Sequence, residues 1–361
     1  ALAILSVLQA VIEQFGRTDD VGARSPQPTV WLVTRGAQAP SFDEDPASSA
    51  DRNCASSAAS QAGAWGLARS VRTELGESLP CVCVDVAPSL GVEVTAQRLI
   101  AEMRSVDSNT SHASSTAVEH ERLLCADGRR LVPRLGRTSP ARLQDDPHQS
   151  SPLCNQGSYL VSGGTGGLGL LVGQWLVERG AEHVVLLSRS GRIPPSSPAY
   201  GFMEAHSAIV QATPCDVGDQ AAVHHLIENV QAQAAPLCGV IHAAGVLRDA
   251  LFMNQTAEDL KTVWAPKVTG ALNLHSTVCD HAGANESVRM FVMFSSLSSL
   301  LGGAGQANYA AANAYLDELA RLEWYRYHLK RGEMTKAREM AVGEAEDAEP
   351  VERRAGGAKF I

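Results

Sequence analysis

Side chains that can move protons gather in one segment of the chain. Residues 291–313 read FVMFSSLSSLLGGAGQANYAAAN, in which an apolar strand-like run ends at Ser296 and Tyr309 opens a helix-like run. Asn313 follows Tyr309 by one helical turn, so both side chains lie on the same helix face. In a parallel α/β sheet, strand ends and helix starts share the edge that binds ligands.

These residue types suit the reduction of a carbonyl group. Hydride addition to a carbonyl makes an alkoxide, which needs a proton donor and a hydrogen bond to its oxygen. Tyr309 is the candidate acid and Ser296 the candidate donor to the oxygen. A cation favours proton release from tyrosine, and Lys267 in WAPKVTG (264–270) is the candidate. As the alternative, a lone tyrosine on a helix is usually a packed aromatic side chain, and a lone lysine is usually a solvated charge. The spacing of these residues as a set favours a catalytic role.

A glycine-rich loop precedes these residues. Residues 162–169 read SGGTGGLG between a strand-like and a helix-like run, and they contain G-x-G-x-x-G. Glycines let the backbone approach a pyrophosphate, and the helix N-terminus attracts its charge. The alternative is a turn that only packs the helix on the sheet, but the strand–loop–helix context favours a dinucleotide. The predicted contacts are Gly163, Gly164, Thr165, Gly166, Gly167, Leu168 and Gly169.

The residues after the next strand-like run favour one cofactor. NAD enzymes carry an acid there for the ribose 2′-hydroxyl, whereas this chain has Ser188 and Arg189. A guanidinium can bind a 2′-phosphate through two hydrogen bonds. The sequence therefore predicts NADPH as cofactor, with a solvated loop arginine as the alternative.

The elements that must position these residues alternate along the second part of the chain. This alternation predicts a Rossmann-type doubly wound parallel sheet over residues 158–329. The predicted strands are 159–162, 183–188, 208–213, 239–242 and 289–294, and the predicted helices are 167–180, 219–233, 257–281 and 309–329.

The first part of the chain predicts a smaller α/β unit with a parallel sheet and no phosphate loop. Residues 1–12 predict an amphipathic helix too short to cross a bilayer. The other predicted elements and boundaries are strands at 29–34 and 79–86, a helix at 61–75, a closing segment at 129–135, a loop at 40–60, a linker at 136–157 and a charged, helical or disordered tail at 330–361.

Charge and cysteine content narrow the function classes. The net charge of −9 argues against nucleic-acid and membrane partners, which need basic patches. The eight cysteines show no metal-ligand spacing. Buried thiols in a reducing cytosol are the favoured interpretation, and a zinc site or a disulfide framework is the weaker one. We therefore expect a cytoplasmic protein without a metal site.

Residues 158–329 resemble the ketoreductase domains of polyketide synthases and of animal fatty acid synthase, within the short-chain dehydrogenase/reductase superfamily. Most members of that superfamily have the lysine four residues after the tyrosine, whereas the synthase branch has asparagine there and the lysine upstream. Asn313 and Lys267 follow the synthase pattern. The motifs that carry the resemblance are SGGTGGLG (162–169), LLSRSG (186–191), CDV (215–217), HAAGVLRDALF (242–252), WAPKVTG (264–270), FSS (294–296) and GQANYAAANAYLDELA (305–320).

The resemblance implies a role for each matching residue. Tyr309 would be the general acid, Ser296 the donor to the carbonyl oxygen, Lys267 the cation and Asn313 a member of the proton relay. Asp216 and Val217 would contact the adenine, and Ala243, Ala244 and Gly245 would line the dinucleotide. Residues 1–135 resemble the family's structural subdomain, a degenerate Rossmann half, through WLVTRGAQA (31–39), QAGAWGLARSVRTEL (61–75) and RRLVPRL (129–135).

The resemblance also implies a substrate and partners. The substrate would be a β-ketoacyl thioester on the phosphopantetheine arm of an acyl carrier protein, with other synthase domains as partners in polyketide or fatty acid biosynthesis. Asp249 in Leu247-Arg248-Asp249 marks the group that forms the D-hydroxyl product, and Leu301 stands where the opposite group has tryptophan.

One departure from the family leaves an alternative open. The family continues with a strand that carries a Trp-Gly pair and then a lid helix, and residues 330–361 show neither. A catalytically impaired dinucleotide-binding or structural module is therefore the second hypothesis. A free-standing dehydrogenase acting on a small alcohol is the third, and the structural first half and the exchanged lysine argue against it.

Overall fold

A computed structural model describes residues 2–15, 28–38, 52–76, 79–109, 119–135, 157–232, 235–281 and 287–330. Its contacts divide the chain into two compact units that do not follow sequence order. The first unit holds the described residues up to 135 together with 250–254 and 297–330, and the second holds those of 157–249 and 255–296.

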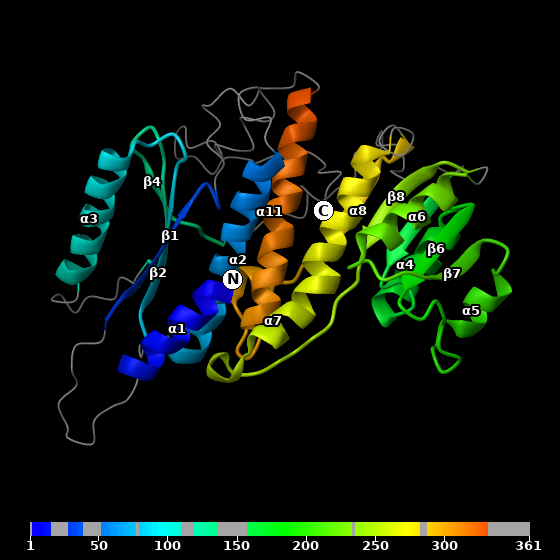
Figure 1. The fold of residues 1–361 in the computed structure, drawn as a ribbon, viewed down its shortest axis with the longest axis horizontal. Coiled ribbons are helices and arrows are strands. Elements are labelled where there is room, and N and C mark those ends of the chain that lie inside the picture. Colours follow the sequence, from blue (N-terminus) through cyan, green and yellow to red (C-terminus); the bar gives the residue numbers. More distant parts are fainter. Residues whose placement is uncertain are drawn as a thin grey trace. The chain divides into compact units, whose positions relative to one another are not determined.

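The second unit is a five-stranded parallel sheet with the order β7-β6-β5-β8-β9 (Figure 1). The central strands, β5 and β8, are buried along their whole length, as strands covered on both faces must be. The predicted doubly wound sheet is confirmed. Its elements are β5 (Ser158–Ser162), α4 (Gly167–Glu178), β6 (His183–Ser188), α5 (Tyr200–Ala205), β7 (Val210–Pro214), α6 (Gln220–Gln231), β8 (Leu237–His242), α7 (Ala257–Trp264), α8 (Gly270–Asp280) and β9 (Met290–Met293).

The first unit contains a four-stranded sheet with the order β1-β2-β3-β4. Its first three strands are parallel, as predicted, but β4 is antiparallel to β3 because a tight turn joins them. The elements are α1 (Leu2–Phe15), β1 (Val30–Arg35), α2 (Arg52–Leu75), β2 (Cys81–Val86), α3 (Val92–Asn109), β3 (Glu121–Leu124), β4 (Arg130–Leu131), the 3₁₀ turn Phe252–Asn254, α10 (Ser298–Leu301) and α11 (Ala307–Lys330).

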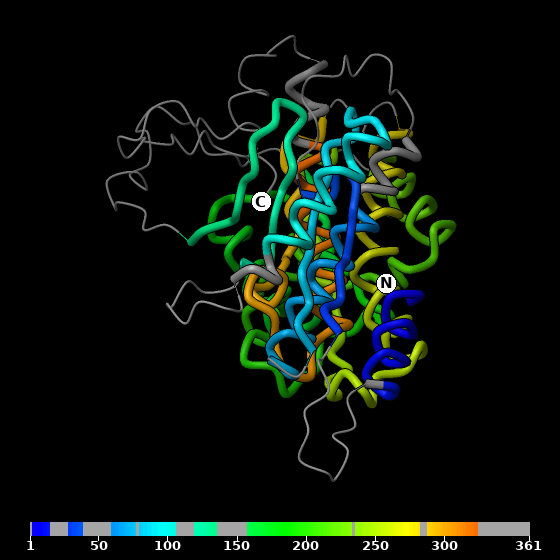
Figure 2. Tube along the Cα trace, turned by 90° about the vertical axis from the view of Figure 1, so that its left-hand side faces the viewer, coloured from blue at the N-terminus to red at the C-terminus, as the bar shows by residue number. Residues whose placement is uncertain are grey.

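Two long helices of the first unit, α2 and α11, run side by side (Figure 1 and Figure 2). Their backbones approach so closely at Gly66 that a Cβ there would lie 2.3 Å from the carbonyl oxygen of Ala310. A glycine is needed at this crossing, because any side chain would push the helices apart. The sequence after β9 therefore packs on a helix that precedes it by more than two hundred residues.

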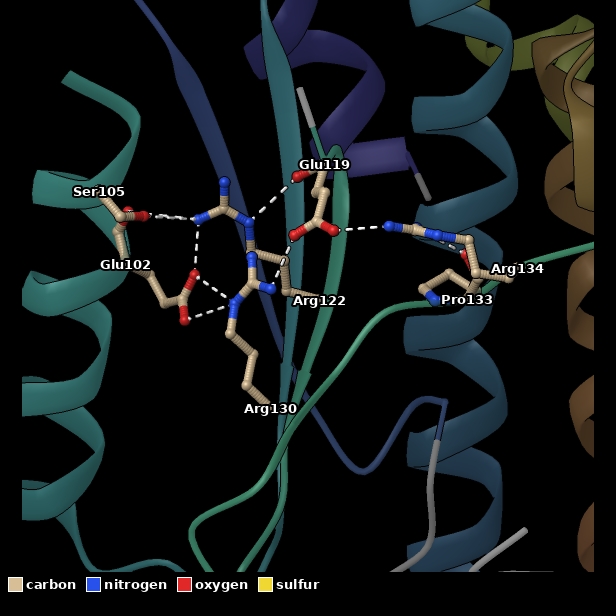
Figure 3. Close-up of polar contacts among 7 residues, drawn as sticks. All are labelled: Glu102, Ser105, Glu119, Arg122, Arg130, Pro133 and Arg134. Atoms are coloured by element: carbon tan, nitrogen blue, oxygen red, sulfur yellow. Dashed lines mark hydrogen bonds and ion pairs between the residues drawn. The ribbon is translucent and has the colours of Figure 1, made fainter. Parts of the chain in front are cut away.

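An arginine–glutamate network joins helix α3 to this sheet (Figure 3). Glu102 of α3 accepts from Arg122 Nη1 at 2.6 Å and from Arg130 Nε at 2.9 Å. Glu119 accepts from Arg130 at 2.7 Å and from Arg134 at 2.6 Å. Arg122 is buried, and burying an unpaired charge costs much free energy. Its ion pair with Glu102 offsets this cost. The network ties α3 to β3 and β4.

Some local predictions are wrong, for identifiable reasons. The predicted loop at 40–60 is helical from Arg52, since its alanines favour a helix. The predicted single helix at 257–281 is interrupted by a π-helical segment, Ala265–Thr269, where Pro266 cannot donate a backbone hydrogen bond. Helices α3 and α5 and strand β3 were not predicted. The linker and the tail beyond Lys330 lie almost wholly outside the described residues.

The described cysteines and helices bear on two further expectations. Cys81, Cys83, Cys215 and Cys238 are buried free thiols, which agrees with the favoured interpretation of their apolar surroundings. Among the described residues, no helix combines the length and the apolar character that crossing a membrane requires.

Candidate active site

The glycine loop lies where the strand order of the second unit reverses. β5 pairs with β6 on one side and with β8 on the other, and ligands bind at such switch points. Gly163 has φ +67°, and a Cβ there would lie 2.8 Å from Ala244. A Cβ at Gly169 would lie 2.2 Å from the carbonyl oxygen of Gly163. Only glycine allows this turn to lie so close to the next backbone.

The helix that follows this loop offers a place for a pyrophosphate. α4 begins at Gly167, and its N-cap residue, Gly166, provides no capping side chain. Gly166, Gly167 and Leu168 are exposed, and a Cβ at Gly167 would meet no atom within 4 Å. The start of α4 is thus exposed and has no side-chain cap, which fits the phosphates of a dinucleotide.

The loops after β6 and β7 lie beside each other and hold the predicted adenosine contacts. Arg189 is exposed just past the carboxyl end of β6. The backbone N–H of Cys215 donates to the carbonyl oxygen of Ser188 at 2.9 Å, which joins the two loops. Asp216 is exposed and accepts from the N–H of Gly218 at 2.9 Å, whereas Val217 is buried.

A buried histidine connects the two central strand ends with the lysine segment. Ser162 Oγ lies 2.6 Å from His242 Nδ1, and His242 Nε2 lies 2.8 Å from the carbonyl oxygen of Lys267. Burial lowers the pKa of His242 to about 4, and the Lys267 cation acts in the same direction. The imidazole is therefore neutral, its Nε2–H donates to the carbonyl, and Nδ1 accepts from the serine hydroxyl.

The ammonium group of Lys267 is anchored near the end of β9. Lys267 is 4% exposed, and its Nζ donates to the carbonyl oxygen of Phe294 at 2.8 Å. Phe294 N–H in turn donates to the carbonyl oxygen of His242 at 2.9 Å. A Cβ at Gly245 would lie 3.1 Å from Lys267 Cε. The second unit thus brings Lys267 close to the Ala243–Gly245 segment and to the strand end that leads to Ser296.

Tyr309 and Asn313 lie together on α11, which belongs to the first unit. Asn313 is buried, and its Nδ2 donates to the carbonyl oxygen of Tyr309 at 2.8 Å. The N–H of Tyr309 donates to Asn308 Oδ1 at 2.6 Å. Tyr309 itself is half-buried. The predicted spacing of one helical turn is confirmed, and the catalytic roles of the two side chains remain predictions.

Ser162 and His242 are residues whose part in this site the sequence did not reveal. Both occur inside motifs already singled out, SGGTGGLG and HAAGVLRDALF. A histidine directly before the Ala-Ala-Gly segment is the one sequence signal that could have drawn attention to His242. Its partner at Lys267 is 25 residues away, and periodicity says nothing about that contact.

The fold and the glycine loop define a dinucleotide-binding α/β protein of the Rossmann type. Residues 157–328 match the family model of the KR domain. The chain is 29% identical to a protein described as an A-type ketoreductase from a modular polyketide synthase, with a TM-score of 0.67, and the match covers 94% of this chain and 59% of that one. The predicted resemblance is confirmed: the family model that matches residues 157–328 is that of the KR domain, and the similar solved structures include ketoreductase domains of polyketide synthases.

Two of the curated proteins that are similar to this chain are synthases. Chalcone synthase cfoA of Aspergillus candidus is 35% identical over 80% of this chain. Lovastatin diketide synthase mokB of Monascus pilosus is 41% identical over 45% of this chain. The matched segments span only 10% and 6% of the lengths of these relatives. KR domains, whose family model matches residues 157–328, are oxidoreductases that bind a nicotinamide dinucleotide.

Proposed function

We propose that this chain reduces a β-ketoacyl thioester, carried by an acyl carrier protein, to the D-β-hydroxyacyl product with NADPH, as part of a polyketide synthase. The observation that carries the proposal is the uncapped glycine-rich helix start at the switch point, with Arg189 exposed at the end of the neighbouring strand. A guanidinium at that place favours a 2′-phosphate, since an acid there would repel it.

The residues of the chain have distinct tasks in this proposal. NADPH, when bound, supplies a hydride to the β-carbon. Ser296 donates a hydrogen bond to the ketone oxygen, and Tyr309 donates the proton that the oxygen gains. Lys267 contributes positive charge, and Asn313 belongs to the relay that returns a proton to Tyr309. Asp216 and Val217 contact the adenine, and the Ala243–Gly245 segment lines the dinucleotide.

In this proposal, the loop sequence indicates the configuration of the hydroxyl group in the product. The nicotinamide face is set by the way the dinucleotide binds, so the hydroxyl configuration depends on the side from which the acyl chain enters. Asp249 and Leu301 both correspond to the D-forming group. Chiral chromatography of the hydroxyacyl product tests this assignment, and a predominantly L-hydroxyl product would contradict it.

The decisive assay combines turnover with binding. The chain is mixed with NADPH and a β-ketoacyl N-acetylcysteamine thioester, and NADPH oxidation and product are followed. We expect Tyr309→Phe to lower turnover at least about a hundredfold, because the variant lacks the proton donor, while NADPH affinity stays unchanged. Turnover within about threefold of wild type would show that Tyr309 is not the acid. Tight NADPH binding by a wild type without turnover would support the dinucleotide-binding module instead.

A further inference from the structure

Two segments next to predicted site residues pack on helix α2 of the structural half. Residues 250–254 begin directly after Asp249, and the loop between α10 and α11 leads to Tyr309. Both segments belong to the first unit, although their neighbours in sequence form the second. Side chains of α2 provide hydrogen-bond partners for the backbone of both.

Glu74, near the C-terminal end of α2, joins the two segments. Its Oε2 accepts from the backbone N–H of Phe252 at 2.6 Å, and its Oε1 accepts from the N–H of Gly305 at 2.8 Å. The N–H of Ala250 also donates to the carbonyl oxygen of Gly305 at 3.0 Å. One carboxylate thus accepts charge-assisted hydrogen bonds from two loops, each more than 170 residues away in sequence.

Further contacts hold the same loops at defined places. Ser70 Oγ accepts from the N–H of Gly303 at 3.2 Å, and Arg69 donates to the carbonyl oxygen of Ser299 at 2.5 Å. Phe252 is fully buried, and its carbonyl oxygen accepts from Gln9 Nε2 at 2.9 Å. Of these contacts, those of Glu74 alone link the two loops through a single side chain. Loss of the carboxylate would therefore remove this shared side-chain link and leave the backbone hydrogen bond between Ala250 and Gly305 to join the two loops.

We propose that Glu74 is a positioning residue that holds both loops in one arrangement and thereby determines which face of the ketone is reduced. The inference rests on the proposed function, because it concerns the product of that reaction. The two loops continue into Asp249 on one side and Tyr309 on the other. A carboxylate that couples them restricts the directions from which an acyl chain can enter. The structural half then contributes to specificity without touching the substrate.

The variant Glu74→Gln tests this role with little change in size. An amide keeps one acceptor oxygen and presents its NH₂ group to the other N–H, so one loop loses its partner. With the thioester substrate, we expect the ratio of major to minor hydroxyl epimer to fall about tenfold, the effect of losing one charge-assisted hydrogen bond, while NADPH affinity stays unchanged. Glu93→Gln, which neutralises an exposed carboxylate on α3, is the matched control and should keep the wild-type ratio.

Hydrogen exchange supplies a second readout that needs no turnover. The amides of Phe252 and Gly305 should exchange at least about tenfold faster in Glu74→Gln, and they should do so together. A wild-type epimer ratio, or unchanged exchange at both amides, overturns the proposal. A purely structural role would lower the unfolding temperature without changing the ratio, which also contradicts it. Absence of product from the wild type counts against the proposed function, and the exchange data then still show whether Glu74 holds both loops.

Discussion

Arg189 is the single residue on which the cofactor assignment depends most. It is exposed just past β6, where an acidic residue would accept the ribose 2′-hydroxyl of NADH. We expect Arg189→Asp to reverse the cofactor preference, because the new carboxylate repels the 2′-phosphate and accepts the hydroxyl. Fluorescence titration with NADPH and NADH measures the change. Equal affinity of the wild type for both cofactors would contradict the assignment. The control is Arg179→Asp, at the exposed C-cap of α4.

One buried side chain, that of His242, contacts several parts of the site, including the segment that carries Lys267. The neutral imidazole accepts from Ser162 and donates to the backbone of Lys267, and its own carbonyl holds Phe294, whose carbonyl accepts from Lys267 Nζ. His242, at the end of β8, thus contacts the backbone of the lysine directly and its ammonium group through Phe294. Lys267 itself lies within the π-helical interruption Ala265–Thr269, and such turns often occur at functional sites.

In the first unit, backbone N–H groups just after β1 donate to an internal carboxylate. The N–H groups of Ala37 and Gln38, after β1, both donate to the carboxylate of Asp85 at 2.9 Å. Thr34 Oγ1 donates to the same carboxylate at 2.7 Å, and Asp85 is 2% exposed. An internal carboxylate thus takes the donors that an anionic ligand would otherwise use.

We therefore expect Asp85→Asn to destabilise the first unit by about 2 kcal/mol, because an amide replaces a charged acceptor of three hydrogen bonds. Urea unfolding followed by circular dichroism measures the difference. Asp127→Asn, in an exposed turn of the same unit, should change stability by less than about 0.5 kcal/mol. If both variants unfold at the same urea concentration, the carboxylate does not hold the loop.

For the molecule as a whole, the free energy of unfolding depends on pH through two buried groups that act in opposite directions. Burial raises the pKa of Glu318 to about 7, although Arg321 pairs with it. The folded chain therefore binds this proton at a higher pH than the unfolded chain, and the stability it contributes is lost as pH rises through 7. His242, with its pKa lowered to about 4, contributes stability above its unfolded value that is lost as pH falls from about 6.5 toward 4.

The variant Glu318→Gln separates the two effects. Between pH 7 and pH 5, wild type should gain about 2 kcal/mol of unfolding free energy relative to the variant, because only wild type takes up a proton on folding at that position. Urea unfolding of both proteins at the two pH values provides the comparison. Parallel pH profiles would mean that Arg321 keeps the carboxylate ionised throughout.

Elements and motifs that depend on neighbours along the chain could be predicted from the residues alone. A buried strand, a glycine turn and a helix start are local, so residues 159–169 predicted their own conformation, and the one-turn spacing of Tyr309 and Asn313 followed from helix geometry. The alternation of strands and helices was enough to predict the doubly wound sheet. Where local preference was ambiguous, as in the alanine-rich start of α2, the sequence predicted the wrong element.

Contacts between residues far apart in the chain could be found in the three-dimensional structure but not predicted from local pattern. Asp85 lies 48 residues from Ala37, and Glu74 lies 231 residues from Gly305. No periodic pattern encodes such pairs, because each depends on the order of strands in a sheet and on which helices pack together. Residues 250–254 and 297–330 belong to the first unit although the residues between them belong to the second. This arrangement also depends on contacts between residues far apart in the chain. It arises from the close fit of α11 on Gly66 of α2, a packing interaction between surfaces that neither helix reveals alone.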